Sequence, residues 1–187
     1  MEIYLIRHTT PKATHGLCYG RSDVSLADSF LEEWKRIQAI IPNVFDVVYS
    51  SPAQRCQNLA KKFKTKNFHT DERLWELNFG VWEMQTWDQI TDPQARVWMD
   101  DFVNIRPPQG ESFRDLQVRV MDFFNQIINS NSVDKMAIVA HAGVVRTILA
   151  HVLNIDLKHI YSLEIDYGSV NLIKHVNQRS KVQFINH

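Results

Sequence analysis

Apolar residues along the chain gather in three short runs that alternate with helical patterns. The runs are rich in β-branched and aromatic residues and lack the alternation of a half-exposed strand, which is typical of strands covered on both faces. They are residues 3–6 (IYLI), 45–49 (FDVVY) and 136–140 (MAIVA). The pattern predicts three central strands of a largely parallel sheet.

Outside these runs, apolar residues recur at spacings of three and four, as they do on the buried face of an amphipathic helix. This spacing predicts four helices, at residues 25–41, 52–63, 113–127 and 144–153. Ser25 and Ser112 are placed to cap the first and the third. Strands that alternate with helices indicate an α/β protein, a three-layer α/β/α sandwich on a mostly parallel sheet.

Two further regions complete the predicted architecture. Residues 170–173 and 182–185 are expected to form two strands that extend one edge of the sheet. Residues 82–110 contain three tryptophans and several helix breakers, and are expected to form short helices inserted as a small lid. The sequence contains no repeat, low-complexity tract or linker, so residues 1–187 are expected to form a single domain.

Charge and composition narrow the classes of partner. Lysine plus arginine and aspartate plus glutamate number 21 each, so no basic field is expected to attract nucleic acid or a membrane surface. The sequence has no signal-peptide pattern after Met1 and no run of about 18 apolar residues, which favours a cytoplasmic protein without a membrane span. Cys18 and Cys56 are expected to be reduced, structural thiols. The predicted partner is a small molecule, and the oligomeric state is left open.

Charged side chains follow the three predicted strands at their carboxyl ends. Arg7 and His8 follow the first strand, Arg55 lies shortly after the second, and His141 follows the third. Because the carboxyl ends of parallel strands meet at one edge of a sheet, two histidines and two arginines are expected to converge there. A lone histidine at a strand end is more often structural, and Arg55 could face water, but three agreeing strand ends favour a site.

The converging residue types point to a phosphoryl group. Two guanidiniums match a multiply charged anion, and helix N-termini after Ser51 and Ala142 would add backbone N–H donors. The neighbouring arginines would lower the pKa of His8 and keep its imidazole neutral, which leaves it competent as a nucleophile. The site is therefore expected to transfer phosphate through a phosphohistidine.

The stretch around His8 resembles a known signature. Residues 5–11 (LIRHTTP) are similar to the RHG signature of the histidine phosphatase superfamily, with Thr9 where glycine is usual. Further motifs of this family follow in order, at residues 19–23 (YGRSD), 50–56 (SSPAQRC), 77–83 (LNFGVWE), 110–112 (GES) and 140–146 (AHAGVVR). The resemblance covers nearly the whole chain and implies a phosphoglycerate-mutase-like fold.

The resemblance also implies roles for individual residues. His8 would be the phosphorylated nucleophile, and Arg7 and Arg55 would clamp the phosphate. His141 would make a further phosphoryl contact. No metal and no other cofactor is implied.

Glu76 matches the general acid of the family. An alkoxide leaving from phosphorus needs a proton, and the attacking water must later lose one, so one carboxyl group can serve both steps. From the residues alone, Glu83 and Glu111 are rivals for this role. Further contacts to substrate or phosphate are expected at Thr14, Tyr19, Gly20, Arg21, Ala142 and Gly143.

The form RHTTP, followed by CYGRSD at residues 18–23, looks most like the α-ribazole phosphatase branch of the family. This resemblance implies a metal-independent phosphomonoesterase that acts on α-ribazole 5'-phosphate, a nucleotide-loop precursor of cobalamin. The alternatives are a phosphoglycerate mutase, a broad-specificity sugar-phosphate phosphatase and a non-catalytic phosphate-binding regulatory module. Trp87 and Trp98 could stack on the base of such a substrate, although packing of short helices onto the domain is the commoner role for such residues.

Overall fold

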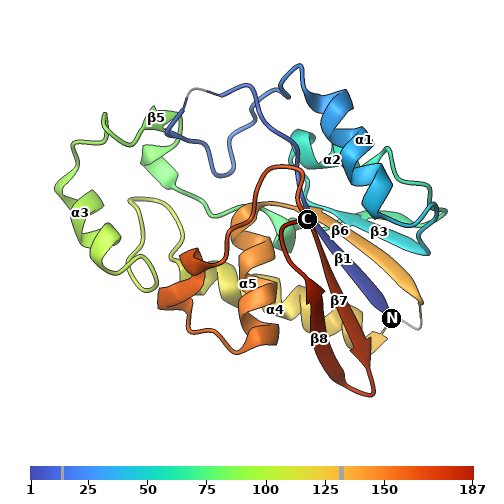
Figure 1. Ribbon diagram of the computed structural model, residues 1–187. Coiled ribbons are helices and arrows are strands. Elements are labelled where there is room, and N and C mark those ends of the chain that lie inside the picture. The colour runs from blue at the N-terminus through green and yellow to red at the C-terminus, as the bar shows by residue number, and fades with distance from the viewer. Residues whose placement is uncertain (14, 131–132) are drawn as a thin grey trace.

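A six-stranded sheet runs through the described part of the chain, residues 1–13, 15–130 and 133–187 of a computed structural model (Figure 1). Its strands lie in the order β4-β3-β6-β1-β7-β8. They are β4 (Phe68–Thr70), β3 (Val47–Ser50), β6 (Lys135–Ala140), β1 (Glu2–Arg7), β7 (Val170–Val176) and β8 (Arg179–Phe184). The first four are parallel, whereas β7 and β8 pair antiparallel at one edge. The mostly parallel sheet and its two added edge strands are confirmed.

The continuous apolar run of β1 is explained by burial on both faces of the sheet. Ile3 and Leu5 are fully buried in one core, while Tyr4 and Ile6 belong to the core on the opposite face. Successive side chains of a strand point to opposite faces, so a strand with two buried faces needs an apolar residue at every position. The same argument holds for β6, where residues 136–140 alternate between the two cores.

Helices cover both faces of the sheet (Figure 1). On one face lie α4 (Phe113–Ser130) and α5 (Ala142–Leu153), and on the other lie α1 (Phe30–Ile40) and α2 (Gln54–Ala60). The protein is therefore a three-layer α/β/α sandwich, as the sequence predicts. Within the described ranges, every helix falls short of the length or apolar character that a membrane span requires.

The helix starts show where local signals hold and where they fail. At Ser112 the expected cap forms, because its hydroxyl accepts the N–H of Asp115 while the Asp115 carboxylate accepts the Ser112 N–H. Ser25 does not cap a helix, and α1 begins only at Phe30. The Ser25 carbonyl instead accepts the N–H of Lys12, which ties this segment to the loop after β1.

The segment at residues 82–110 combines a short strand with one helix. Strand β5 (Gln85–Thr86) pairs antiparallel with β2 (Leu17–Cys18), and α3 (Pro93–Asp100) follows it. The Trp98 side chain is buried, with its ring stacked on Trp87 at a centroid distance of 5.5 Å. Trp98 therefore packs the inserted helix onto the rest of the protein. The sequence predicts short helices here but gives no sign of the β2–β5 pair.

Candidate active site

The carboxyl ends of β1, β6 and β3 lie side by side. Arg7 pairs with Ala140 in the parallel register of β1 and β6, and Ser50 pairs with Val139 across β3 and β6. The residues that follow these strands therefore meet at one edge of the sheet, as expected. A cavity of about 290 Å³ opens there, and its lining includes Arg7, His8, Glu76 and His141.

His8 is a buried imidazole with a defined tautomer. Its side chain is 2% exposed, and Nδ1 lies 2.8 Å from the carbonyl oxygen of Thr9. Because a carbonyl can only accept, Nδ1 carries the proton and Nε2 keeps its lone pair. Burial lowers the pKa of His8 well below its ordinary value of 6.5, and the charges of Arg55 and Arg7 lower it further. The ring is therefore neutral at pH 7, as the sequence predicts.

Arg7 and Arg55 bring two guanidiniums close to His8. Arg7 lies over the Tyr167 ring, 3.6 Å from its centroid, and donates to the carbonyl of Ile165 at 2.6 Å. Arg55 is fully buried, and its two terminal nitrogens donate to the carbonyls of Ser22 and Gly20 at 2.8 and 2.6 Å. Among the described residues, neither guanidinium forms an ion pair with a carboxylate.

Among the described residues that line the cavity, Glu76 is the only acidic side chain. The Nε atoms of Arg7 and Arg55 are buried and lack a hydrogen-bond partner within the described protein. A buried donor without a partner is costly, so the Nε of Arg7, which lines the cavity, is suited to an anion that enters it. Arg55 itself stands behind the cavity wall, next to His141, rather than in the lining.

His141 forms the N-cap of α5 and is 1% exposed. Its Nδ1 lies 3.3 Å from a terminal nitrogen of Arg55, and its Nε2 lies 2.8 Å from Ser51 Oγ. A guanidinium can only donate, so Nδ1 accepts and Nε2 carries the proton. Burial, Arg55 and His8 lower the pKa of His141 well below 6.5, in that order of importance. The second ring is therefore also neutral, 5.3 Å from the first between centroids.

Glu76 is held by backbone donors beside these histidines. Its carboxylate accepts the N–H of Leu77 at 2.9 Å and the N–H of Gly143, in the first turn of α5, at 3.1 Å. The two segments approach so closely that a Cβ on residue 143 would lie 2.3 Å from a Glu76 oxygen. Glycine at this position therefore lets the carboxylate reach the N-terminus of α5.

The structure separates Glu76 from its two rivals. Glu83 accepts hydrogen bonds from the backbone N–H groups of Arg21 and Ser22, and Glu111 forms ion pairs with Arg21 and Arg119. Neither carboxylate belongs to the lining of the cavity. Of the three candidates for the proton donor, only Glu76 faces the histidines.

The remaining candidate residues differ in whether the structure brings them to the cavity. Tyr19, Gly20, Ala142 and Gly143 line the cavity, although the Gly143 N–H is occupied by Glu76. Arg21 is not brought to the cavity, because its guanidinium pairs with Glu111 at 2.7 Å. Thr14 lies outside the described residues.

Several residues that line the cavity are not predicted as site residues from the sequence. Arg146 lies one turn after Ala142 on α5, so helical spacing within the 140–146 motif is a signal that could have found it. Tyr161 and Tyr167 also line the cavity, but they lie in the region of the short 3₁₀ helix η3 (Leu157–Ser162) and the loop after it. No spacing in the sequence marks these two tyrosines.

The two neutral histidines give a testable pH dependence of stability. In the unfolded chain each ring titrates near 6.5, whereas in the folded protein both pKa values lie well below it. The unfolded state therefore binds more protons as the pH falls through about 6.5, and the stability contributed by the neutral rings is lost in that direction. We expect the free energy of unfolding to fall by up to about 1.4 kcal/mol per pH unit for each histidine below that point.

Urea unfolding at about pH 7.5, 6.5 and 5.5 measures this slope. His141→Asn should make the slope shallower, whereas His159→Asn, at an exposed position of η3, should leave it unchanged. A parent protein with equal stability at all three pH values would contradict the neutral, buried state of the two rings.

The described residues include no group of three or more histidine, cysteine, aspartate or glutamate side chains that could hold a metal ion. The cysteines are free and buried, and burial raises the pKa of each thiol to about 12. The reactive groups of the cavity are therefore the imidazoles, the Glu76 carboxylate and the guanidiniums.

Comparison with known proteins agrees with this chemistry. Residues 3–187 match the family described as the histidine phosphatase superfamily (branch 1). The adenosylcobalamin/alpha-ribazole phosphatase of Escherichia coli K12 is 25% identical over 187 residues, which cover 96% of this chain and 92% of that protein. Phosphoserine phosphatase 1 of Hydrogenobacter thermophilus is 23% identical over 190 residues, covering 97% and 90%.

The fold also matches solved structures. The crystal structure of the alpha-ribazole phosphatase from Shigella flexneri aligns with a TM-score of 0.89 at 24% identity, covering 100% of this chain and 96% of that one. The expected phosphoglycerate-mutase-like fold is therefore confirmed. At this level of identity the structural match shows the fold alone.

Proposed function

The chain belongs to the histidine phosphatase superfamily and is a phosphomonoesterase, and we propose that it hydrolyses its substrate through a phosphoryl group carried on His8. One observation carries this proposal. The Thr9 carbonyl holds the Nδ1 proton of His8, which leaves a lone pair on Nε2 of a buried, neutral ring. A neutral imidazole held in one tautomer is prepared for attack on phosphorus.

In the first step, His8 Nε2 attacks phosphorus in line with the leaving oxygen. The N–P bond forms as the O–P bond breaks, and Glu76 gives its proton to the leaving alcohol. Arg7, in the cavity lining, stabilises the charge on the equatorial phosphoryl oxygens, and Arg55 adds positive charge from behind the cavity wall. His141 adds a neutral N–H donor, which is hydrogen-bonded to the Ser51 hydroxyl in the free protein.

In the second step, water attacks the phosphohistidine. Glu76, now a carboxylate, takes a proton from this water as the N–P bond breaks, and inorganic phosphate leaves. The two steps return both Glu76 and His8 to their starting states. The same carboxyl group can act twice because it stays beside the histidines, held by Leu77 and Gly143.

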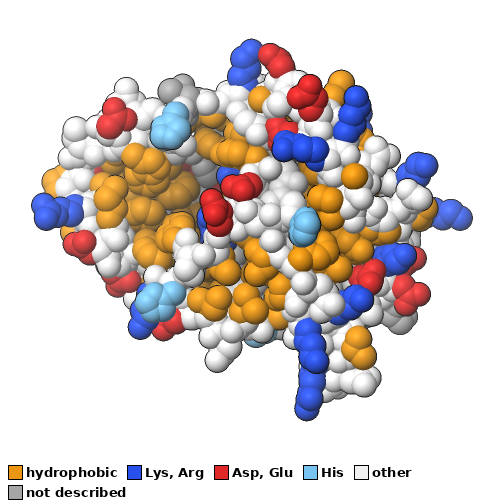
Figure 2. Space-filling model, viewed as in Figure 1, with side chains coloured by type: hydrophobic (Ala, Val, Ile, Leu, Met, Phe, Trp, Pro, Cys, Tyr) orange, Lys and Arg blue, Asp and Glu red, His pale blue; other side chains and the backbone are white. Residues whose placement is uncertain are grey.

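For the leaving group, we favour an alcohol that carries an aromatic base, as in α-ribazole 5'-phosphate. The RHTTP stretch and the named α-ribazole phosphatase relative support this choice. The wall of the cavity also supports it, because it includes Phe79, Trp87, Phe113 and Tyr161. Figure 2 shows hydrophobic side chains gathered on the inserted segment between β5 and α3. Trp87 faces the cavity, whereas Trp98 is buried behind it.

Two alternatives are less well supported. A mutase would return the phosphoryl group to a hydroxyl of a sugar acid. Such a substrate has no aromatic ring that could stack on the aromatic wall of the cavity. A non-catalytic phosphate-binding module would not need the Glu76 carboxylate beside two neutral histidines. Product analysis with 3-phosphoglycerate separates the mutase from the hydrolase, since only the hydrolase releases inorganic phosphate.

The matched pair of α-ribazole 5'-phosphate and ribose 5-phosphate tests the leaving group, because the two differ at C1 of the ribose, where one carries the base and the other a hydroxyl group. We expect kcat/KM to be at least about 10-fold higher with the base present, and higher than with phosphoserine. Trp87→Ala should reduce the preference for the base several-fold, whereas Trp87→Phe should retain most of it. Equal kcat/KM for the two ribosyl phosphates, or a Trp87→Ala protein with an unchanged preference, would count against an aromatic leaving group.

A further inference from the structure

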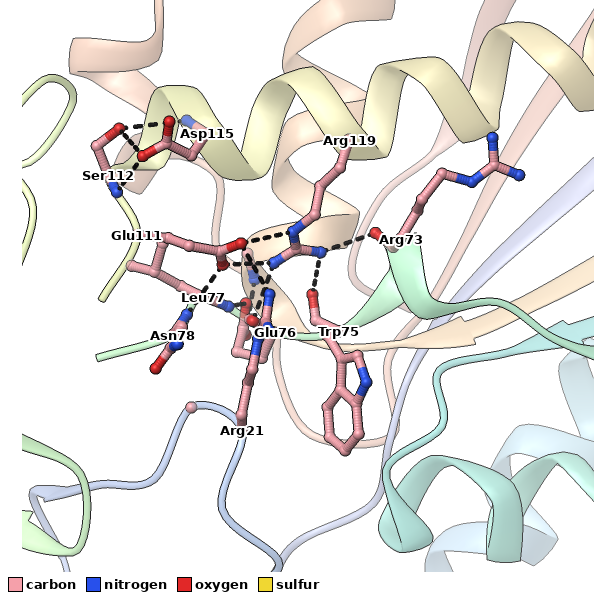
Figure 3. Close-up of polar contacts among 12 residues, drawn as sticks. Arg21, Arg73, Trp75, Glu76, Leu77, Asn78, Glu111, Ser112, Asp115 and Arg119 are labelled. Atoms are coloured by element: carbon pink, nitrogen blue, oxygen red, sulfur yellow. Dashed lines mark hydrogen bonds and ion pairs between the residues drawn. The ribbon is translucent and has the colours of Figure 1, made fainter. Parts of the chain in front are cut away.

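We propose that Arg119, paired with Glu111, is a positioning residue that fixes the main chain around Glu76 and so aims its carboxyl group at the leaving oxygen (Figure 3). The inference rests on the proposed role of Glu76 as proton donor. Neither Arg119 nor Glu111 lines the cavity. Their hydrogen bonds reach the cavity through the main chain around Glu76.

Arg119 binds the segment that carries Glu76 at three carbonyl groups. One terminal nitrogen donates to the carbonyls of Arg73 and Trp75 at 2.8 and 2.6 Å. The other donates to the carbonyl of Glu76 itself at 3.0 Å. Apart from one short 3₁₀ turn, η1 (Glu72–Leu74), residues 72–79 have no regular secondary structure that would pair these carbonyls. The fork of one guanidinium supplies the donors that a helix or strand would supply elsewhere.

Glu111 completes the arrangement on the far side of Glu76. Its carboxylate accepts from Arg119 Nε at 3.1 Å and from a terminal nitrogen at 2.9 Å. One of its oxygens also accepts the N–H of Asn78 at 3.2 Å, while the Glu111 N–H donates to the Asn78 carbonyl at 2.8 Å. The chain is thus fastened both before and after Glu76 by one ion pair, as Figure 3 shows.

The ion pair is anchored on a rigid part of the fold. Arg119 lies on α4, and Glu111 immediately precedes the Ser112 cap of that helix. The helix packs into the core through Phe113, Leu116 and Val120, and the two charged side chains are only 16% and 19% exposed. A bidentate, largely buried pair of this kind holds its geometry better than an exposed one. The position of Glu76 is therefore fixed relative to α4, the longest helix of the described chain.

The expected consequence is a loss of proton transfer without a loss of phosphoryl binding. The charge and the N–H donors offered to the phosphoryl group come from Arg7, Arg55 and His141, none of which is hydrogen-bonded to Arg119. A misplacement of about 1 Å in a reacting group can cost on the order of 100-fold in rate. In kcat/KM, which reports the first step, that cost appears only when the leaving group needs a proton, because p-nitrophenolate departs without one.

The experiment compares kcat/KM for an alkyl phosphate and for p-nitrophenyl phosphate in the protein of residues 1–187. We expect Arg119→Gln to lower the alkyl value by about 10- to 100-fold and the p-nitrophenyl value by less than about 3-fold. Arg119→Lys should recover part of the alkyl value, since it keeps the charge beside Glu111 but loses the fork. In a Glu76→Gln background, Arg119→Gln should cost less than about 2-fold more.

Arg106→Gln is the matched control, because Arg106 pairs with Asp115 of the same helix but does not contact residues 73–78. It should leave both kcat/KM values unchanged. An equal fall for both substrates in Arg119→Gln, or no fall, would overturn the positioning role alone. A Glu76→Gln protein that shows no leaving-group dependence would overturn this role together with the proposed proton donor.

Discussion

Replacement of His8 by alanine is expected to lower kcat/KM for every phosphomonoester by at least about 10⁴-fold. His141 is not placed to take over as nucleophile, because both of its ring nitrogens are occupied, by Arg55 and Ser51. The Cys56 thiol is buried, and burial raises its pKa to about 12. Release of inorganic phosphate from p-nitrophenyl phosphate and from α-ribazole 5'-phosphate measures the loss.

A matched control distinguishes lost chemistry from lost structure. His159→Ala removes an imidazole from an exposed position of η3 and should keep activity within about 2-fold of the parent. Urea unfolding of His8→Ala should still show one cooperative transition, since the imidazole borders an open cavity rather than a closed core. Retention of more than about 1% of the parent activity by a folded His8→Ala protein is incompatible with the proposed nucleophile.

The second large effect is expected from Glu76→Gln. An amide cannot give a proton to the leaving alkoxide, so kcat/KM for α-ribazole 5'-phosphate should fall by about 10²- to 10⁴-fold. For p-nitrophenyl phosphate, whose leaving group needs no proton, the first step should be nearly unaffected. A fall that depends on the leaving group is therefore the mark of a lost general acid, and steady-state kinetics with a series of aryl and alkyl phosphates measures it.

Glu83→Gln gives the matched comparison for this prediction. Its carboxylate lies outside the cavity lining and holds the backbone of Arg21 and Ser22, so any loss should be similar for all leaving groups. The opposite pattern, with leaving-group dependence in Glu83→Gln and none in Glu76→Gln, would move the proton donor to Glu83. Sequence reasoning alone could not have excluded that outcome.

The meeting of His8 and His141 could be predicted from the sequence because it depends on strand registers. Two apolar runs with both faces buried identify β1 and β6, and parallel pairing brings their carboxyl ends to one edge. The charged residues that follow these runs must then be neighbours. This inference needs only the alternation of strands and helices, which the apolar pattern of the segments predicts.

The choice of Glu76 could not be made in this way. Without the family resemblance, the three glutamates are equivalent in the sequence, and they are separated by tertiary hydrogen bonds such as that between Glu76 and the Gly143 N–H. Arg21 illustrates the same limit, because its pairing with Glu111 joins residues that are 90 positions apart. Tyr161 reaches the cavity from the short 3₁₀ helix η3 and Tyr167 from the loop after it, and neither segment is long enough for a periodic pattern to indicate the direction of a side chain.

The start of α1 shows a local signal overruled by tertiary contacts. Ser25 precedes a helical pattern and is predicted to cap a helix. In the structure, its segment instead pairs with the loop after β1. Pro11 forms an isolated bridge with Leu26, so the helix begins only after the chain has left that bridge. The cap preference is worth only about 1 kcal/mol, which such contacts can outweigh.

The most direct test of the account is the site and the chemistry of the phosphorylated intermediate. Protein mixed with substrate and quenched in base should carry a phosphoryl group that is stable in base and labile in acid, bound to Nε2 of His8. ³¹P NMR and peptide mapping identify the atom and the residue, and His8→Ala should carry no label. A phosphoryl group on serine or aspartate, or one on Nδ1 of His8, would contradict the tautomer and the mechanism derived from the contact between His8 Nδ1 and the Thr9 carbonyl.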